Sequence, residues 1–107
     1  MNNRYLMTKL TEDCKYDEQL ILNDIISYIN STYTGHYVGK NDVQVVDIWK
    51  SLGSIESTAR DTAIKYLMRF GKKEGKNKKD LLKAIHYIMM LIHFSDNGDN
   101  DETHTKS

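Results

Sequence analysis

Apolar residues recur at helical spacing through most of this chain and predict a fold made of helices. Residues three and four positions apart lie on one side of a helix, so rows with this spacing mark the sides that face a core. A first helix is predicted over about residues 11–30, with the row Leu22, Ile26, Ile29 and Tyr33. A last helix is predicted to end at about Phe94, with the inner row Leu81, Ile85, Ile88 and Ile92. Proline, the strongest helix breaker, is absent.

Two further helices are predicted between these. Residues 43–52 are rich in valine, which suits a strand, but Val45, Ile48 and Trp49 keep helical spacing, so we expect a short helix with Asp42 as its N-cap. Gly53 is expected to end this helix, and Ser54 to cap a third helix that runs to about Phe70. The predicted core row of the third helix is Ala59, Ala63, Tyr66, Leu67 and Phe70.

Polar and glycine-containing stretches separate these helices. Residues 30–42 predict a loop, and residues 71–77 a turn in which Gly71 takes a left-handed conformation and Asn77 caps the last helix. Residues 1–10 are predicted to be a flexible N-terminus and residues 95–107 a disordered acidic tail. We therefore expect a single domain over residues 11–94, an all-α compact bundle of about four helices. The wide apolar surface of the last helix predicts a homo-oligomer.

Composition narrows the class of protein. Hydrophobic residues make up 39% of the 107 residues, and no apolar run approaches the roughly 20 residues that span a bilayer. The N-terminus has no signal-peptide pattern, so an intracellular protein that does not bind membranes is expected. The formal net charge is zero, which gives no electrostatic case for binding nucleic acid along the whole chain. Cys14 is the only cysteine and excludes an internal disulfide.

Basic residues are concentrated around the turn before the last helix. Between residues 69 and 83 there are seven basic residues against two acidic ones. Lys65, Arg69 and Lys72 recur along one side of the third helix and could bind phosphate groups. A solvated helix side on which Asp61 pairs with Lys65 would give the same pattern, and spacing alone favours that interpretation. The turn lacks the glycine, lysine and hydroxyl spacing of a phosphate-binding P-loop.

The histidines do not predict a metal site. His36 lies in the loop, His86 and His93 are seven residues apart, and no H-E-x-x-H pattern occurs. The acidic tail also departs from the spacing of a calcium-binding loop. We therefore expect no metal ligands among the side chains of the chain.

Aromatic residues leave two alternatives open. In the glycine-flanked loop, His36 and Tyr37 could stack on a base. Alternatively, Tyr37 packs on the helices and His36 caps a helix end. Trp49 and Tyr66 lie on apolar rows, so we expect them to belong to the core rather than to a ligand site.

An ordered series of short motifs resembles the phage nucleotide kinase-like proteins, a small phage family whose domain was long described as one of unknown function. The motifs cover roughly residues 35 to 92. They are His36-Tyr37, then Val43 to Ile48 with Asp47, Ala63-Ile64-Lys65-Tyr66, Arg69-Phe70-Gly71-Lys72-Lys73, and Asp80-Leu81-Leu82-Lys83-Ala84 with Tyr87. One departure is clear, because Asp61-Thr62 stands where the family usually has Gly-Asn.

The resemblance implies an all-helical phage protein that binds nucleotides in the cytoplasm of the infected bacterial host. It further implies a deoxynucleoside monophosphate kinase that uses ATP with Mg²⁺, since a relative has that activity. The alternative is a non-enzymatic phage protein that sequesters a nucleotide signal or blocks a host defence protein. If the residues at matching motif positions have the roles they have in the family, the phosphate-binding residues would be Lys65, Arg69, Lys72 and Lys73. His36 and Tyr37 would face the nucleotide, and Asp80 and Lys83 would complete the site from the opposing helix.

Overall fold

A computed structural model describes residues 9–34, 42–72 and 75–99 of the chain. Within these ranges the regular elements are four helices, with no strand and one isolated bridge between Lys72 and Gly75. The helices are α1 (Glu18–Thr34), α2 (Asp42–Ser51), α3 (Ile55–Arg69) and α4 (Lys78–Asp99). The predicted all-α fold is therefore confirmed. No helix in the described ranges has both the length and the apolar character needed to cross a membrane.

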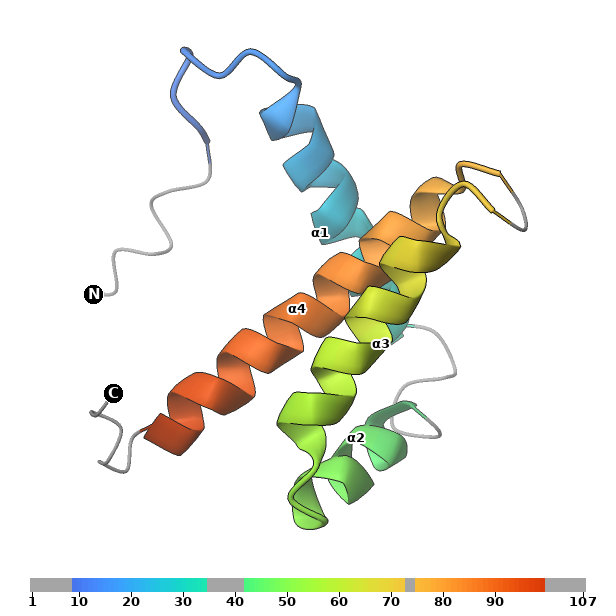
Figure 1. The fold of residues 1–107 in the computed structure, drawn as a ribbon. Coiled ribbons are helices and arrows are strands. Elements are labelled where there is room, and N and C mark those ends of the chain that lie inside the picture. The colour runs from blue at the N-terminus through green and yellow to red at the C-terminus, as the bar shows by residue number, and fades with distance from the viewer. Residues whose placement is uncertain (1–8, 35–41, 73–74, 100–107) are drawn as a thin grey trace, which may run out of the picture.

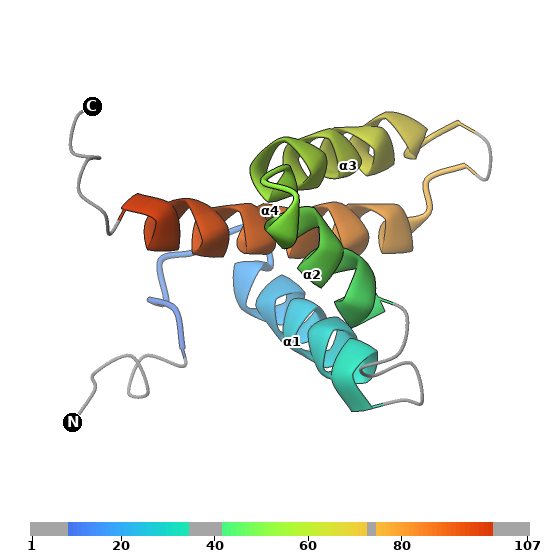
Figure 2. The same ribbon diagram turned by 90° about the horizontal axis from the view of Figure 1, so that it is seen from below.

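The helices α3 and α4 form a hairpin, and the other two helices are arranged around α4. After α3, the chain turns and returns along it as α4 (Figure 1). Seen from below, α1 lies on the side of α4 away from α3, and α2 lies in front of α4 (Figure 2). Thus α4 is the central element of the fold.

Small side chains form the tightest part of the hairpin. Ala59, Ala63 and Ala84 are 0%, 4% and 1% exposed, so α3 and α4 approach each other along alanines. Three residues predicted to lie in the inner rows, Leu67, Ile88 and Ile92, are instead 50%, 40% and 56% exposed. The helical spacing of these apolar residues predicted that they face the core. The closest approach follows the alanines, and this turns the larger neighbours outward.

Most helix ends near the hairpin agree with the sequence predictions. Gly53 and Gly71 have φ of 77° and 86°, the left-handed conformation expected after a helix. The Asn77 side chain caps α4, because its Oδ1 accepts a hydrogen bond from the Lys79 backbone N–H at 2.9 Å. The prediction for Ser54 was only half right. It occupies the N-cap position of α3 but makes no side-chain cap.

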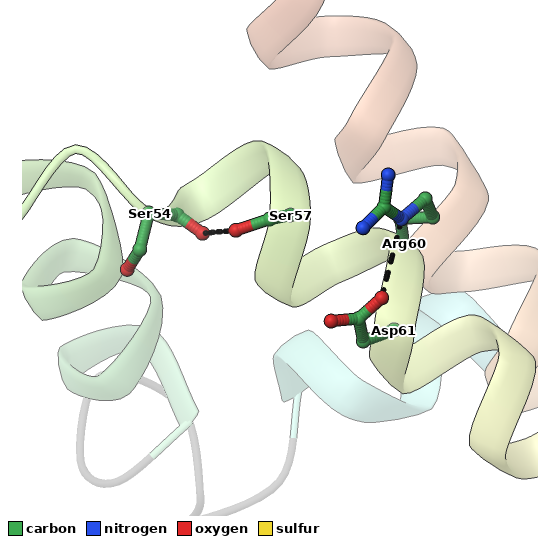
Figure 3. A network of polar contacts seen from close by, with 4 residues as sticks. All are labelled: Ser54, Ser57, Arg60 and Asp61. Atoms are coloured by element: carbon green, nitrogen blue, oxygen red, sulfur yellow. Dashed lines mark hydrogen bonds and ion pairs between the residues drawn. The ribbon is translucent and has the colours of Figure 1, made fainter.

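Around Ser54, the hydroxyl groups bond to carbonyls instead. Ser54 Oγ donates to the Trp49 carbonyl oxygen at 3.4 Å. Ser57 Oγ donates to the Ser54 carbonyl oxygen at 3.3 Å (Figure 3). These bonds join the end of α2 to the first turn of α3. The turn at residues 52–54 is therefore held by both of its flanking helices.

The outer ends of α1 and α4 differ from prediction. The helix α1 begins at Glu18 rather than near residue 11, because Asp17 has a φ of 62° that interrupts the helix. The Glu18 carboxylate accepts a hydrogen bond from the Tyr16 N–H at 2.7 Å, which holds the preceding chain in this bend. At the other end, α4 continues past Phe94 to Asp99, so the first part of the predicted disordered tail is helical. Residues 1–8, 35–41, 73–74 and 100–107 lie outside the described residues.

Candidate functional site

Three cationic side chains meet at one tyrosine ring between α3 and α4. Lys65 Nζ, Arg69 Cζ and Lys83 Nζ lie 4.8, 5.0 and 5.2 Å from the centroid of the Tyr66 ring. Lys65 precedes Tyr66 in α3, Arg69 follows it by one turn, and Lys83 comes from α4. Each distance is within the range of a cation–π interaction. We call these four residues the Tyr66 cluster.

The Tyr66 cluster carries three like charges in a small space. No described carboxylate pairs with any of the three, because the ion pairs recorded for the described residues join Arg60 with Asp61 and Lys78 with Asp24. Because all three charges lie around one ring, an anion bound beside it would be attracted by each of them. The charge arrangement is therefore suited to an anionic ligand.

Asp61 does not form an ion pair with Lys65 of the Tyr66 cluster. The sequence allowed an Asp61–Lys65 pair on a solvated helix side, but the Asp61 carboxylate binds Arg60 Nε at 3.2 Å (Figure 3). Both side chains of that pair are more than 60% exposed, at 62% and 66%. The neighbouring Thr62, in contrast, faces a groove beside the cluster. Of the two residues that depart from the family pattern, only Thr62 therefore lies at the candidate site.

The groove has a volume of about 860 Å³ and is lined by all four helices. Lys65, Tyr66 and Lys83 form part of its lining, so two of the three cations lie at the groove itself. Its remaining lining is largely aromatic and apolar, and its other polar members are Asp47, Thr32, Thr62 and the two histidines His86 and His93. An apolar groove with a few polar groups at defined positions is typical of a small-molecule site.

One row of aromatic rings extends from the cluster into α2. The rings of Tyr66 and Tyr87 are stacked, with centroids 6.1 Å apart and planes at 16°. Trp49 continues the row from α2, 6.3 Å from the Tyr87 ring. All three line the groove. This row offers flat surfaces to a planar ligand.

A second group of rings joins α1 to α4. The His86 ring contacts Tyr28 and Tyr33 edge-on, with both pairs of centroids 6.1 Å apart. These three residues also line the groove. The groove therefore has aromatic side chains on the α1 side and on the α2–α3 side, and α4 contributes to both.

The structure brings together some of the predicted site residues. Lys65, Arg69 and Lys83 lie around the ring of Tyr66. Lys72 is exposed in the turn, where its backbone N–H donates to the Arg69 carbonyl oxygen. Asp80 is only 6% exposed and is not among the groove-lining residues. The remaining predicted residues, His36, Tyr37 and Lys73, lie outside the described residues.

Sequence reasoning missed much of the groove. Trp49 and Tyr66 were expected in the core, but they are half-buried and line the groove. His86 was considered only as a metal ligand, although Lys83, His86 and Tyr87 are spaced to share one side of α4. This spacing could have identified His86 and Tyr87 as neighbours of Lys83 in the site. No group of three or more histidine, cysteine or acidic side chains that could hold a metal occurs in the described part of the chain.

Comparisons with known proteins identify the family of this chain. No curated protein and no solved structure matches it. A family model described as "protein of unknown function (DUF3310)" matches residues 29–89, which span more than half of the 107 residues and most of the groove. The chain therefore belongs to the DUF3310 family of proteins of unknown function.

Proposed function

We propose that this is a phage protein that binds a nucleotide in the groove, in the cytoplasm of the infected bacterial host. The phosphate group lies on the Tyr66 cluster and the base lies among the aromatic rings. The observation that carries the proposal is the convergence of Lys65, Arg69 and Lys83 on one ring that lines an aromatic groove.

Electrostatics support the phosphate end of this site. A nucleoside monophosphate brings up to two negative charges to three positive ones. Arg69 offers a planar fork of N–H donors, whereas Lys65 and Lys83 act as point charges. Charge-assisted hydrogen bonds of this kind are roughly twice as strong as neutral ones. The bound phosphate would therefore be attracted by all three cations of the cluster.

Aromatic contacts support the base end. A base has two flat surfaces, and stacking on an aromatic side chain contributes about 1–3 kcal/mol per base. Tyr87 and Trp49 offer ring faces beyond Tyr66, and His86 lies on the α1 side. Thr62 and Asp47 supply hydrogen-bonding groups that could contact the base or sugar.

We further propose, from the resemblance to phage nucleotide kinase-like proteins, that the bound nucleotide is a deoxynucleoside monophosphate phosphorylated by ATP. Lysine and arginine side chains would stabilise the charge on the transferring phosphoryl group. Mg²⁺ bound with ATP takes most of its ligands from phosphates and water and needs only one or two carboxylates. Asp47 is a carboxylate that lines the groove and fits this role.

A second candidate function is a non-enzymatic one, in which the protein sequesters a nucleotide signal or blocks a host protein. Most of α1 precedes the family match, and it exposes Leu20 and Ile26 by 63% and 55%. Exposed apolar side chains of this kind favour a protein contact. We also propose that the protein self-associates, because exposed apolar residues occur on α4 as well.

Incubation with nucleotides distinguishes these functions. The purified protein would be mixed with a panel of deoxynucleoside monophosphates, ATP and Mg²⁺, and free and bound nucleotides would be identified by mass spectrometry. New diphosphates that disappear in Lys65→Ala, but not in the control Arg60→Ala, would support a kinase. A nucleotide that is retained unchanged would support sequestration. The proposed site would be contradicted if no diphosphate formed and no nucleotide stayed bound to the protein.

A further inference from the structure

The side of α4 away from the groove carries an apolar row that nothing in the described structure covers completely. Its members are Leu81, Ile85, Ile88 and Ile92, spaced by four, three and four residues. Ile88 and Ile92 are 40% and 56% exposed, and the other two are half-buried. The groove is lined by other residues of α4. We call these four residues the apolar seam.

The spacing of the apolar seam is that of paired helices. Alternation of three and four residues is the a/d pattern with which one helix packs along another in a coiled coil. Branched isoleucine and leucine fill such positions well. The adjacent helix α3 adds Leu67 and Ile64, which are 50% and 45% exposed. A surface row of this type therefore fits a partner helix rather than water.

We propose that a second copy of this chain covers the apolar seam, with the two α4 helices antiparallel. A row that meets its own copy about a two-fold axis makes a closed, self-complementary interface. Centred between Ile85 and Ile88, this arrangement sets Ile85 against Ile88 of the partner subunit. It also sets Leu81 against Ile92 of the partner subunit, so each seam residue has an apolar counterpart.

The charges at the two ends of α4 favour the antiparallel direction. Lys78 and Lys79 lie in the first turn, whereas Asp96 lies in the last part of the helix. The antiparallel register brings Lys78 beside Asp96 of the partner subunit. Lys78 already binds Asp24 at 2.6 Å, so its ammonium group would bridge two carboxylates. A parallel pair would instead bring the lysines of both copies together and repel.

This arrangement rests on the proposed self-association and is independent of nucleotide binding. It uses the side of α4 opposite to His86 and Lys83, so both grooves of the dimer stay accessible. The two proposals can therefore fail separately.

The mass of the protein in solution tests the seam. Analytical ultracentrifugation without nucleotide should give at least twice the 12.4 kDa monomer mass for the wild type and the monomer mass for Ile88→Lys. The control is Leu52→Lys, which changes an apolar residue that is 72% exposed at the end of α2. This control should keep the wild-type mass. A monomeric wild type at all concentrations, or an Ile88→Lys variant with the wild-type mass, would overturn the proposal.

Cross-linking tests the direction and does not depend on whether Ile88→Lys folds. In a Cys14→Ser background, Leu81→Cys with Ile92→Cys should form a disulfide-linked dimer on oxidation. Ile92→Cys alone should not, because in an antiparallel pair its two copies lie eleven residues apart, about 16 Å along the helix. A disulfide needs Cα atoms within about 7 Å. Disulfide-linked dimers of the Ile92→Cys single variant would contradict the antiparallel seam. A double variant that forms no disulfide-linked dimer would also contradict it.

Discussion

The α3–α4 hairpin buries Ala59, Ala63 and Ala84 almost completely, whereas α1 has no buried residue. A surface ion pair from Asp24 to Lys78 and the ring contacts of His86 hold α1 against α4. An exposed ion pair of this type contributes only about 0–1 kcal/mol. The same groove thus has one wall that belongs to the hairpin with its buried alanines and one wall, on α1, without a fully buried residue.

This difference separates two tasks within one small fold. The hairpin fixes the Tyr66 cluster, because all four residues of the cluster belong to α3 or α4. The helix α1 contributes Tyr28 and Tyr33 to the opposite wall. We infer that ligand binding changes α1 more than the hairpin. The predictions below test this contrast in order of expected effect.

The largest effect is expected from Ala59→Leu. Ala59 is 0% exposed, so three more carbon atoms must displace α3 from α4. Overpacking of this kind costs about 1–3 kcal/mol, and we expect the upper end because the contact is made by alanines. Thermal unfolding followed by circular dichroism should show a lower Tm. The matched variant Leu20→Ala on α1, where the side chain is 63% exposed, should change stability by less than about 0.5 kcal/mol.

His86→Ala should weaken nucleotide binding. Loss of one ring contact with the base corresponds to about 1–3 kcal/mol, or roughly a fivefold to 150-fold rise in Kd. His86→Phe keeps a ring against Tyr28 and Tyr33, so calorimetry should give it a Kd closer to that of the wild type. If His86→Ala bound nucleotide as tightly as the wild type, the α1 wall would have no part in the site.

Nucleotide should protect α1 from hydrogen exchange more than it protects the hairpin. A ligand at a tenfold excess over its Kd stabilises the bound state by about 1.4 kcal/mol, which appears where the free protein opens most easily. Mass spectrometry of deuterium uptake should show slower exchange over residues 24–34 on binding. Equal slowing in α1 and in the hairpin would remove the distinction between the two walls.

The smallest effect is expected from Asp24→Asn. This change removes the ion pair with Lys78 but keeps a similar shape. We expect a loss of no more than about 0.5 kcal/mol in global stability, with faster hydrogen exchange confined to α1. A large drop in Tm would mean that α1 is as firmly held as the hairpin.

The sequence predicted the helices better than their contacts. Gly53, Gly71 and Asn77 marked helix ends correctly because their conformational and capping preferences are local. The start of α1 was wrong because the bend at Asp17 depends on its φ of 62°, which no apolar pattern reveals. On α3 the predicted core positions of Ala59 and Ala63 are confirmed. On α4 the predicted inner row omitted the buried Ala84, because alanine contributes little to a hydropathy pattern.

For the candidate site, the sequence predicted the cationic residues but not that they lie around the ring of Tyr66. The spacing of Lys65 and Arg69 placed them on one side of α3, and the family resemblance added Lys83. The approach of Lys83 to Tyr66 depends on how α4 crosses α3, which spacing within one helix does not determine. The aromatic walls depend on contacts between several helices at once, so Trp49 could not be assigned from its own row.

The most direct test of nucleotide binding uses Trp49, the single tryptophan of the chain, which lines the groove. Its fluorescence would be titrated with deoxynucleoside monophosphates in the wild type, in Lys65→Ala with Arg69→Ala, and in the control Arg60→Ala. We expect a saturable change in the wild type and the control, and a Kd at least about tenfold higher in the double variant, since each lost charged contact contributes about 1.5–3 kcal/mol. A double variant that titrates like the wild type would contradict the Tyr66 cluster as the phosphate site.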